Sequence, residues 1–153
     1  QGFESSWPRD LSGGMAQRLT AWPTTEGAPD WSPDGKTIAF ASNRMRNGEA
    51  GNLFHHLWTM PATGGQATYH GEGTSPDWSP DGREILLIRR LLGLETDIWK
   101  LPGGGGQAVP VLETPELENW PRWSPDGKQI LFTRATGGDN IWIADLSGLG
   151  VLR

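Results

Sequence analysis

Short apolar runs recur along the chain at a nearly constant spacing. They cover residues 37–41, 84–88 and 129–133, and each follows the sequence Trp-Ser-Pro-Asp-Gly, which begins at Trp31, Trp78 and Trp123. Successive copies of this sequence lie 47 and 45 residues apart. Because consecutive positions of each run are apolar, the runs predict strands in the middle of sheets that are covered on both faces.

The other strands of each repeat follow from turn residues and from a second series of landmarks. Ser, Pro and Gly in Trp-Ser-Pro-Asp-Gly hold the positions that a tight hairpin turn requires. A third strand is predicted around Trp58, Trp99 and Trp142, and a fourth at residues 67–69 and 108–111, after glycine clusters. Four strands per repeat indicate an all-β fold built from β-propeller blades.

The repeat resembles the TolB-type, WD40-like propeller repeat, whose units share Pro-x-Trp-Ser-Pro-Asp-Gly-Lys/Arg. Here this sequence begins at Pro29, Pro76 and Pro121, so the resemblance extends over three repeats and nearly the whole chain. Family blades often carry Asp before the third-strand Ile-Trp, and that position holds His56, Asp97 and Asn140. The resemblance implies a β-propeller, whereas a fold alone does not give a function.

Counting strands predicts twelve, which make three four-stranded blades. An unpaired outer strand is expected at about residues 14–21, blade 1 at about 27–71, blade 2 at about 73–113 and blade 3 at about 117–153. Propellers close with about four to eight blades, so we predict that two copies form a six-bladed homodimeric ring. Each blade 3 would receive its outer strand from the partner, through Gln17, Arg18, Leu19 and Thr20. The alternative is that the chain is a piece of a longer propeller.

Composition excludes several classes of protein. The 153 residues suit one domain, and 22 Gly, 12 Pro and 9 Trp favour β-structure with many turns. A net charge of −5 without a basic run argues against nucleic acid as a partner. The apolar stretches are far too short for membrane insertion. Since there is no Cys, disulfides and thiolate metal sites are excluded.

Motifs for chemistry are absent from the sequence: there is no Gly-x-Ser-x-Gly, no phosphate-binding loop and no His-Glu-x-x-His. We therefore expect no catalytic residue, metal or cofactor, and predict a non-enzymatic scaffold that binds a protein, peptide or small ligand at the channel mouth. The alternative is a fragment, or a gating or catalytic domain, of a propeller enzyme of the peptidase or polysaccharide lyase type. The resemblance implies a periplasmic or other extracytoplasmic location, and an envelope protein or peptide as a partner besides the second copy.

Arginines gather in the loops that join second and third strands, namely Arg44, Arg46, Arg89, Arg90 and Arg134. In the propellers that the chain resembles, these loops share one face with the loops that enter the inner strands, and here the latter carry glutamates. Either the charges form ordinary surface pairs, or the arginines bind an acidic ligand or partner through bidentate hydrogen bonds.

Two tryptophans lie outside the repeated positions. They are Trp22 and Trp120, and Trp120 stands where the other repeats have Ala28 and Ser75. Such a ring can stack on a sugar or peptide, form a hot spot for a partner, or plug the channel.

Three charged residues hold matching positions on the predicted inner strands: Asp30, Asp77 and Arg122. We expect them to line the channel. The aspartates also offer a weaker alternative, a site for a cation.

Overall fold

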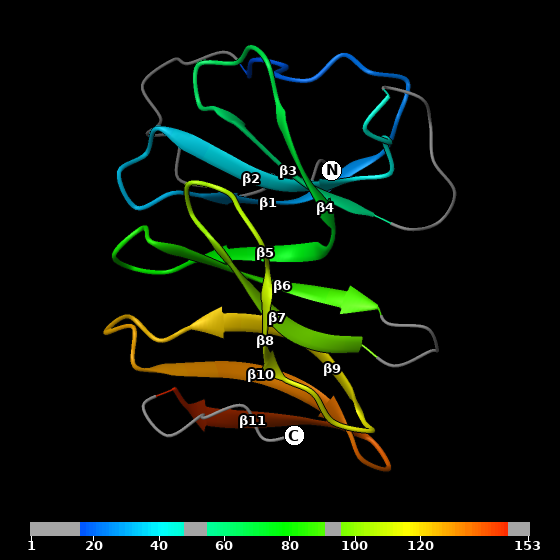
Figure 1. The fold of residues 1–153 in the computed structure, drawn as a ribbon, viewed down its shortest axis with the longest axis vertical. Coiled ribbons are helices and arrows are strands. Elements are labelled where there is room, and N and C mark those ends of the chain that lie inside the picture. Colours follow the sequence, from blue (N-terminus) through cyan, green and yellow to red (C-terminus); the bar gives the residue numbers. More distant parts are fainter. Residues whose placement is uncertain (1–15, 48–54, 91–95, 147–153) are drawn as a thin grey trace, which may run out of the picture.

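The computed structural model describes residues 16–47, 55–90 and 96–146, and in these ranges the all-β prediction is confirmed. Eleven strands form three antiparallel sheets (Figure 1). Blade 1 contains β1 (Glu26–Trp31), β2 (Thr37–Ser42), β3 (His56–Pro61) and β4 (Thr68–Glu72). Blade 2 contains β5 (Thr74–Trp78), β6 (Glu84–Arg90), β7 (Thr96–Pro102) and β8 (Val109–Leu112). Blade 3 contains β9 (Leu117–Trp123), β10 (Gln129–Ala135) and β11 (Asp139–Asp145).

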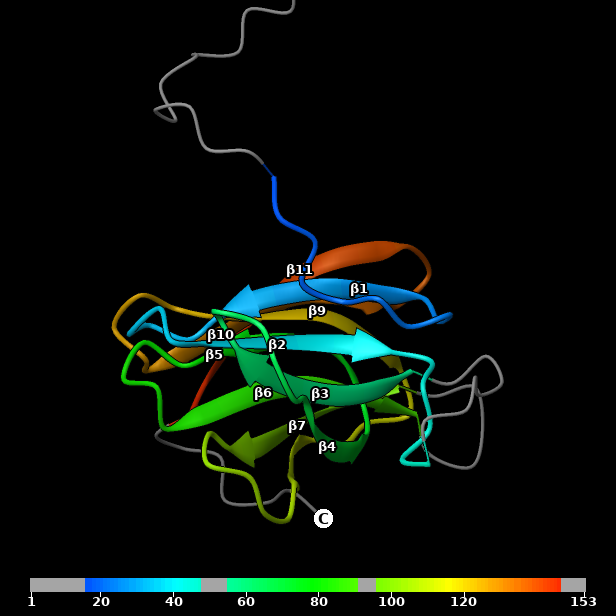
Figure 2. The ribbon, with the colours of Figure 1, turned by 90° about the horizontal axis from the view of Figure 1, so that it is seen from above.

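The three sheets are stacked along the longest axis of the molecule (Figure 1), and hydrogen bonds link the strands of each sheet in chain order. Figure 2 shows that successive sheets are rotated relative to one another. In this view β4, the outermost strand of blade 1, and β11, the outermost strand of blade 3, lie on opposite sides of β1. The first strand of each blade lies against the next blade's first strand, β1 against β5 and β5 against β9. This arrangement makes β1, β5 and β9 the inner strands.

The Trp-Ser-Pro-Asp-Gly sequence forms the turn between first and second strands. In blade 1, Ser32 Oγ donates to Asp34 Oδ1 at 2.7 Å and accepts from the Thr37 amide at 2.9 Å, while Asp34 Oδ1 accepts from the Lys36 amide at 3.0 Å. The Gly35 amide donates to the Ser32 carbonyl, with a φ of 69° that suits glycine. The same bonds recur in blades 2 and 3. The repeat therefore encodes one self-contained hairpin.

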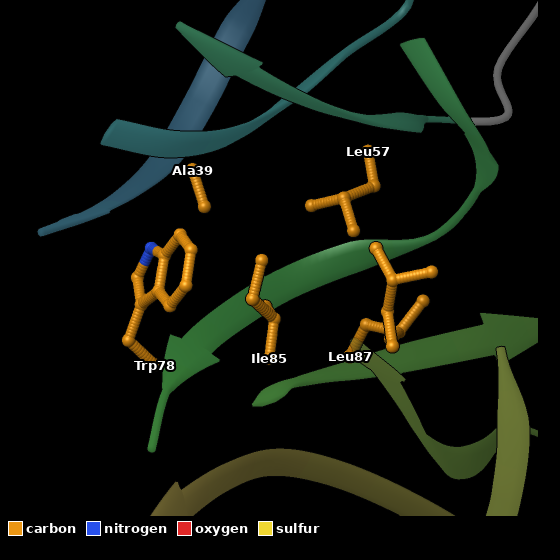
Figure 3. Packing of buried hydrophobic residues seen from close by; sticks show 6 residues of the cluster. Ala39, Leu57, Trp78, Ile85 and Leu87 are labelled. Carbon is orange, nitrogen blue, oxygen red and sulfur yellow. The ribbon is translucent and has the colours of Figure 1, made fainter. Parts of the chain in front are cut away.

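Apolar side chains fill the spaces between blades. Between blades 1 and 2 the buried cluster consists of Ala39, Leu57, Trp78, Ile85, Leu87 and Leu101 (Figure 3). Between blades 2 and 3 it consists of Leu86, Ile88, Ile98, Ile130 and Phe132. Each such side chain stabilises the fold by roughly 1.5–3 kcal/mol when it is fully buried.

A third cluster covers the outer side of blade 1, against which none of the three described sheets packs. Phe40 and Trp58 belong to it, and Leu19 and Trp22 from the N-terminal segment lie on top. The Trp22 and Phe40 rings stack with centroids 6.3 Å apart. This segment therefore acts as a lid on blade 1.

The described part contains eleven of the twelve predicted strands, because residues 16–21 form no strand. A strand needs a sheet edge to pair with, and the described part of the chain provides none beside this segment. The predicted clasp by Gln17, Arg18, Leu19 and Thr20 stays a prediction, as does a fourth strand for blade 3. Residues 14–15 and 147–153, which those predictions also include, lie outside the described residues.

Candidate functional site

The inner strands carry a hydrogen bond, called here the latch, that ties each blade to the next. Asp30 Oδ2 accepts from the backbone amide of Trp78 at 2.7 Å, and Asp77 Oδ2 accepts from that of Trp123 at 2.6 Å. Arg122 holds the same place in blade 3, and its Nη1 donates to Asp77 Oδ1 at 3.1 Å. The structure thus brings together Asp77 and Arg122, two of the three residues expected to line the channel.

The Asp77 side chain is 14 % exposed, whereas that of Arg122 is 53 % exposed. Burial raises the pKa of its carboxyl, while the Trp123 amide and the Arg122 guanidinium partly oppose this shift. The Asp77 carboxyl is therefore both a latch acceptor and the group that holds the Arg122 guanidinium beside the junction.

Trp120 has a left-handed backbone, with a φ of 55°, immediately before Pro121. Ala28 and Ser75 adopt the same conformation in the other blades, with φ of 48° and 52°. This conformation costs a residue with a Cβ about 1–2 kcal/mol, and strain of this kind persists where the surrounding structure imposes it. The Trp120 side chain is 62 % exposed, so blade 3 presents a large ring from a strained position.

The prediction that all five arginines lie in loops is wrong for three of them, because β6 contains Arg89 and Arg90 and β10 contains Arg134. Three of the five arginines stack on the third-strand tryptophan of their own blade. The guanidinium carbon of Arg89 lies 4.8 Å from the Trp99 ring centroid, and that of Arg134 lies 5.0 Å from the Trp142 centroid. Arg44 lies between two rings, 3.5 Å from Trp22 and 3.8 Å from Trp58, and is buried.

These three stacks were missed by the sequence analysis, although a signal existed. Arg89 and Arg134 each lie 11 residues after the first-strand tryptophan of their blade, and Arg44 lies 13 residues after Trp31. An arginine that is present in every blade at a similar place is better explained by packing within the blade, here on the third-strand tryptophan, than by a ligand. Arg46 and Arg90 do not follow this spacing, and both are exposed.

The Arg134 site also contains a buried carboxylate. Glu118 is fully buried, and its Oε1 accepts from Arg134 Nε at 3.0 Å and from the Thr114 hydroxyl. Its other oxygen, Oε2, is buried and has no hydrogen-bond partner among the described residues. Burial raises the pKa of Glu118 above its usual value, against the opposing effects of Thr114 and Arg134.

A small cleft of about 120 Å³ lies where the loops of the three blades meet. His55 and Glu72 line it from blade 1, Arg90 and Thr96 from blade 2, and Asn119 from blade 3. Of the five arginines, Arg90 is the one that lines this cleft. The described ranges contain no group of three or more His, Asp or Glu that could hold a metal ion.

Blade 3 exposes apolar side chains that its sister blades bury. Leu131 is 42 % exposed and Ile141 75 %, whereas the equivalent Leu86 and Ile98 of blade 2 are 0 % exposed. Ile143 pairs with Leu131 across the sheet and is also exposed. We call these three residues the open face.

The opposite end of the stack has a matching feature. The first-strand tryptophans of blades 2 and 3 pack against the preceding blade, and Trp78 is 9 % exposed. Trp31 of blade 1 is 58 % exposed, since no blade precedes it among the described residues. Trp31 therefore has the exposure expected of an inter-blade residue without its neighbour.

Comparison with protein families agrees with the repeat and the blade geometry. The model of the TolB beta propeller domain matches residues 7–150. The chain belongs to this TolB propeller family. A comparison with curated protein sequences gives no match.

Solved structures resemble this TolB propeller chain at low sequence identity. Acinetobacter baumannii TolB matches with a TM-score of 0.64 at 21 % identity, over 82 % of this chain and 31 % of that one. A putative TolB from Agrobacterium tumefaciens matches with a TM-score of 0.59 at 20 % identity, over 82 % of this chain and 60 % of that one. The propeller domain of the trilobed protease from Pyrococcus furiosus, described as having an open velcro topology, matches with 0.62 at 18 % identity, over 81 % and 40 %. The TolB propeller chain thus spans less than two thirds of each relative.

Within the described residues, the TolB propeller chain has no helix that is long and apolar enough to cross a membrane.

Proposed function

We propose that the chain is a non-enzymatic propeller scaffold, which pairs with a second copy to close a six-bladed ring and binds a protein, peptide or small ligand at the channel mouth. The observation that carries this proposal is the contrast in exposure between equivalent residues. Ile141 is exposed while Ile98 is fully buried, so the open face has the composition of a blade interface.

The second copy is the occupant that fits this face best. In blades 1 and 2 the residues equivalent to Leu131 and Ile141 are covered by a following blade that carries a first-strand tryptophan. Blade 1 of a second copy brings such a residue, the exposed Trp31. Burying the open face against Trp31 is favourable. Because Leu19 and Trp22 cover the outer side of blade 1, pairing requires their segment to move off that side.

A second candidate is a propeller domain of a peptidase. It is favoured by the resemblance to the trilobed protease propeller and to an acylaminoacyl peptidase, of which this chain covers 24 %. In that case the missing blades would come from further parts of the same polypeptide, and the isolated chain would not pair. The extracytoplasmic location that the family implies, and an envelope protein as partner, belong to the first candidate.

Light scattering over a dilution series tests the proposal, because one copy has a mass of 16.7 kDa. We expect a particle of twice this mass, and we expect Ile141→Lys to shift it to the single-copy mass. The matched control is Val109→Lys, which places the same charge on an exposed apolar residue of β8, away from both ends of the stack. A wild-type chain of single-copy mass at tens of micromolar would contradict pairing and favour the peptidase-domain candidate.

A further inference from the structure

The junction after blade 3 lacks the acceptor that the other junctions use. Both latches place an aspartate of one blade against the first-strand tryptophan amide of the next, at 2.7 Å for Asp30 and 2.6 Å for Asp77. The third member of this row is Arg122. Since a guanidinium has only donors, it cannot accept a hydrogen bond from a following blade.

Arg122 is nevertheless held at this junction, and only one of its three guanidinium nitrogens makes hydrogen bonds with the described residues. Its Nη1 contacts Asp77 Oδ1 at 3.1 Å and the Pro76 carbonyl oxygen at 3.4 Å. Its Nε and Nη2 have no hydrogen-bond partner among the described residues, and its side chain is 53 % exposed. Asp77 thus fixes one end of the guanidinium and leaves the rest of the fork available.

The blade that would follow brings another donor to the same place. The Ser32 amide donates to the Thr37 carbonyl across the hairpin at 2.8 Å. Because amides alternate in direction along a strand, the Trp31 amide points away from β2, as the amides of Trp78 and Trp123 do. Within the described part of the chain, no carboxylate stands opposite the Trp31 amide.

We propose that a carboxylate group of a bound ligand fills this place, bridging the Arg122 guanidinium of one copy and the Trp31 amide of the next. This inference rests on the ring closure proposed above. A carboxylate is the group that the two intact latches use, and the guanidinium fork matches its planar geometry. The ligand class is therefore a peptide that offers an aspartate side chain or its C-terminus.

The net charge of the site agrees with this assignment. Arg122 faces one carboxylate, Asp77, which already accepts from the Trp123 amide. Asp77 already has one carboxylate near it, because Asp30 lies close enough to help raise the pKa of Asp77. The structure therefore tolerates a carboxylate near Asp77. The guanidinium separates the two negative charges at the open junction.

Acetate tests the site as a minimal carboxylate. The dissociation constant of the dimer is measured by light scattering in sodium acetate and in sodium chloride at equal ionic strength. A ligand that binds only the closed ring strengthens pairing by mass action, so we expect acetate to lower the dissociation constant by about threefold or more. Inorganic phosphate forms a third arm, and an effect of phosphate without one of acetate would overturn the carboxylate assignment.

Two variants separate the inference from the proposed function. Arg122→Asp restores a latch acceptor, so its dimer is expected to be tighter than wild type in chloride and to give no response to acetate. Arg122→Met removes the fork without adding an acceptor, and is expected to lose the acetate response. The control Arg83→Asp makes the same charge change in an exposed turn and keeps the response.

The outcomes are distinct. A wild-type dimer whose strength is equal in acetate and chloride would overturn the inference and leave ring closure intact. If wild type and Arg122→Asp both have the single-copy mass in every buffer, ring closure fails, and the carboxylate site fails with it.

Discussion

The two ends of the three-blade stack differ in how their apolar side chains are shielded from water. At the blade 1 end, Leu19 and Trp22 cover the outer apolar side of the sheet, and Phe40 beneath them is buried. At the blade 3 end, Leu131 and Ile141 stay exposed. These are opposite faces of a blade, because Phe40 is equivalent to the buried Phe132 and not to Leu131. The described part of the chain supplies a cover at one end of the stack and none at the other. The difference shows that exposure at the blade 3 end comes from the absence of a neighbour and not from the residues themselves.

The largest expected effect compares one isoleucine in its covered and uncovered setting. Ile98→Ala leaves a cavity between blades 2 and 3, so we expect it to lower the free energy of unfolding by about 2–5 kcal/mol. Ile141→Ala, at the equivalent position of the open face, is expected to cost less than about 0.5 kcal/mol. Urea unfolding is measured at concentrations too low for pairing. Equal losses at the two positions would mean that the open face is covered within a single chain.

Removing the lid at the other end is the next largest change. Trp22→Ala deprives Phe40 of its stacked ring and Arg44 of one of its two aromatic faces, and we expect a loss of roughly 2–3 kcal/mol because Trp22 is only partly buried. Trp31→Ala removes the same side chain from an exposed position of the same blade, and is expected to cost under about 1 kcal/mol in the unpaired chain. Thermal melting of both variants, with their dimer masses, checks this. A Trp22 variant as stable as wild type would show that the N-terminal segment is no lid.

The arginines of the two end blades have different neighbours. Arg44 of blade 1 lies between two tryptophans, whereas Arg134 of blade 3 has one and an ion pair with buried Glu118. Below its raised pKa Glu118 is uncharged, and glutamine then keeps most of its contacts, so we expect Glu118→Gln to destabilise the chain by about 1 kcal/mol or less at low pH. Because the folded-state pKa of Glu118 is raised, the wild type loses stability as pH rises from below its usual pKa through the raised one. The variant lacks this loss, so its deficit is expected to shrink as pH rises.

Asp126 provides a control of opposite sign in the same blade. The Ser124 hydroxyl and the Lys128 amide lower its pKa, so its contribution is present above the usual pKa and is lost as pH falls through the lowered one. The deficit of Asp126→Asn is therefore expected to grow as pH rises. Urea unfolding at several pH values compares both variants with wild type, and a Glu118→Gln deficit that also grew with pH would refute the raised pKa.

The smallest expected effect concerns the left-handed residues of the end blades. Trp120→Gly removes the conformational cost of a side chain at a φ of 55°, so we expect a gain of about 0.5–1 kcal/mol after the greater entropy loss of glycine. Ala28→Gly, at the equivalent position of blade 1, is expected to behave alike. Capture of an acidic peptide by the paired chain should weaken only for Trp120→Gly. If both variants capture the peptide equally well, Trp120 is not a contact.

Much of the fold could be predicted because the blade is encoded locally. The bonds among Ser32, Asp34 and Thr37 all lie within six residues, so a repeated pentapeptide is enough to place each hairpin. The third strands were found in the same way, from Trp58, Trp99 and Trp142. The strand expected at about residues 14–21 depends on another sheet edge, and periodicity along one chain carries no information about that edge.

The candidate site was less predictable, because its partners are distant in sequence. The expected row of Asp30, Asp77 and Arg122 was found by repeat position, but the latch bonds join residues 46 and 48 positions apart. The charge of the five arginines left two alternatives, surface pairs or ligand binding. The tryptophans that Arg44, Arg89 and Arg134 stack on became visible only once the strands were paired. Sequence alone also could not separate the buried Glu118 from Glu113 and Glu116, neither of which is buried.

The rotation between successive sheets decides what kind of object a head-to-tail contact builds. An end that binds the opposite end of a copy is a heterologous contact, which gives a ring only if the rotations sum to a full circle, and otherwise an open filament. Three blades that each turn by roughly 60° make two copies close. A substitution between blades 1 and 2 that opened or narrowed this angle would convert a closed pair into a fibre, without altering any residue of the contact itself.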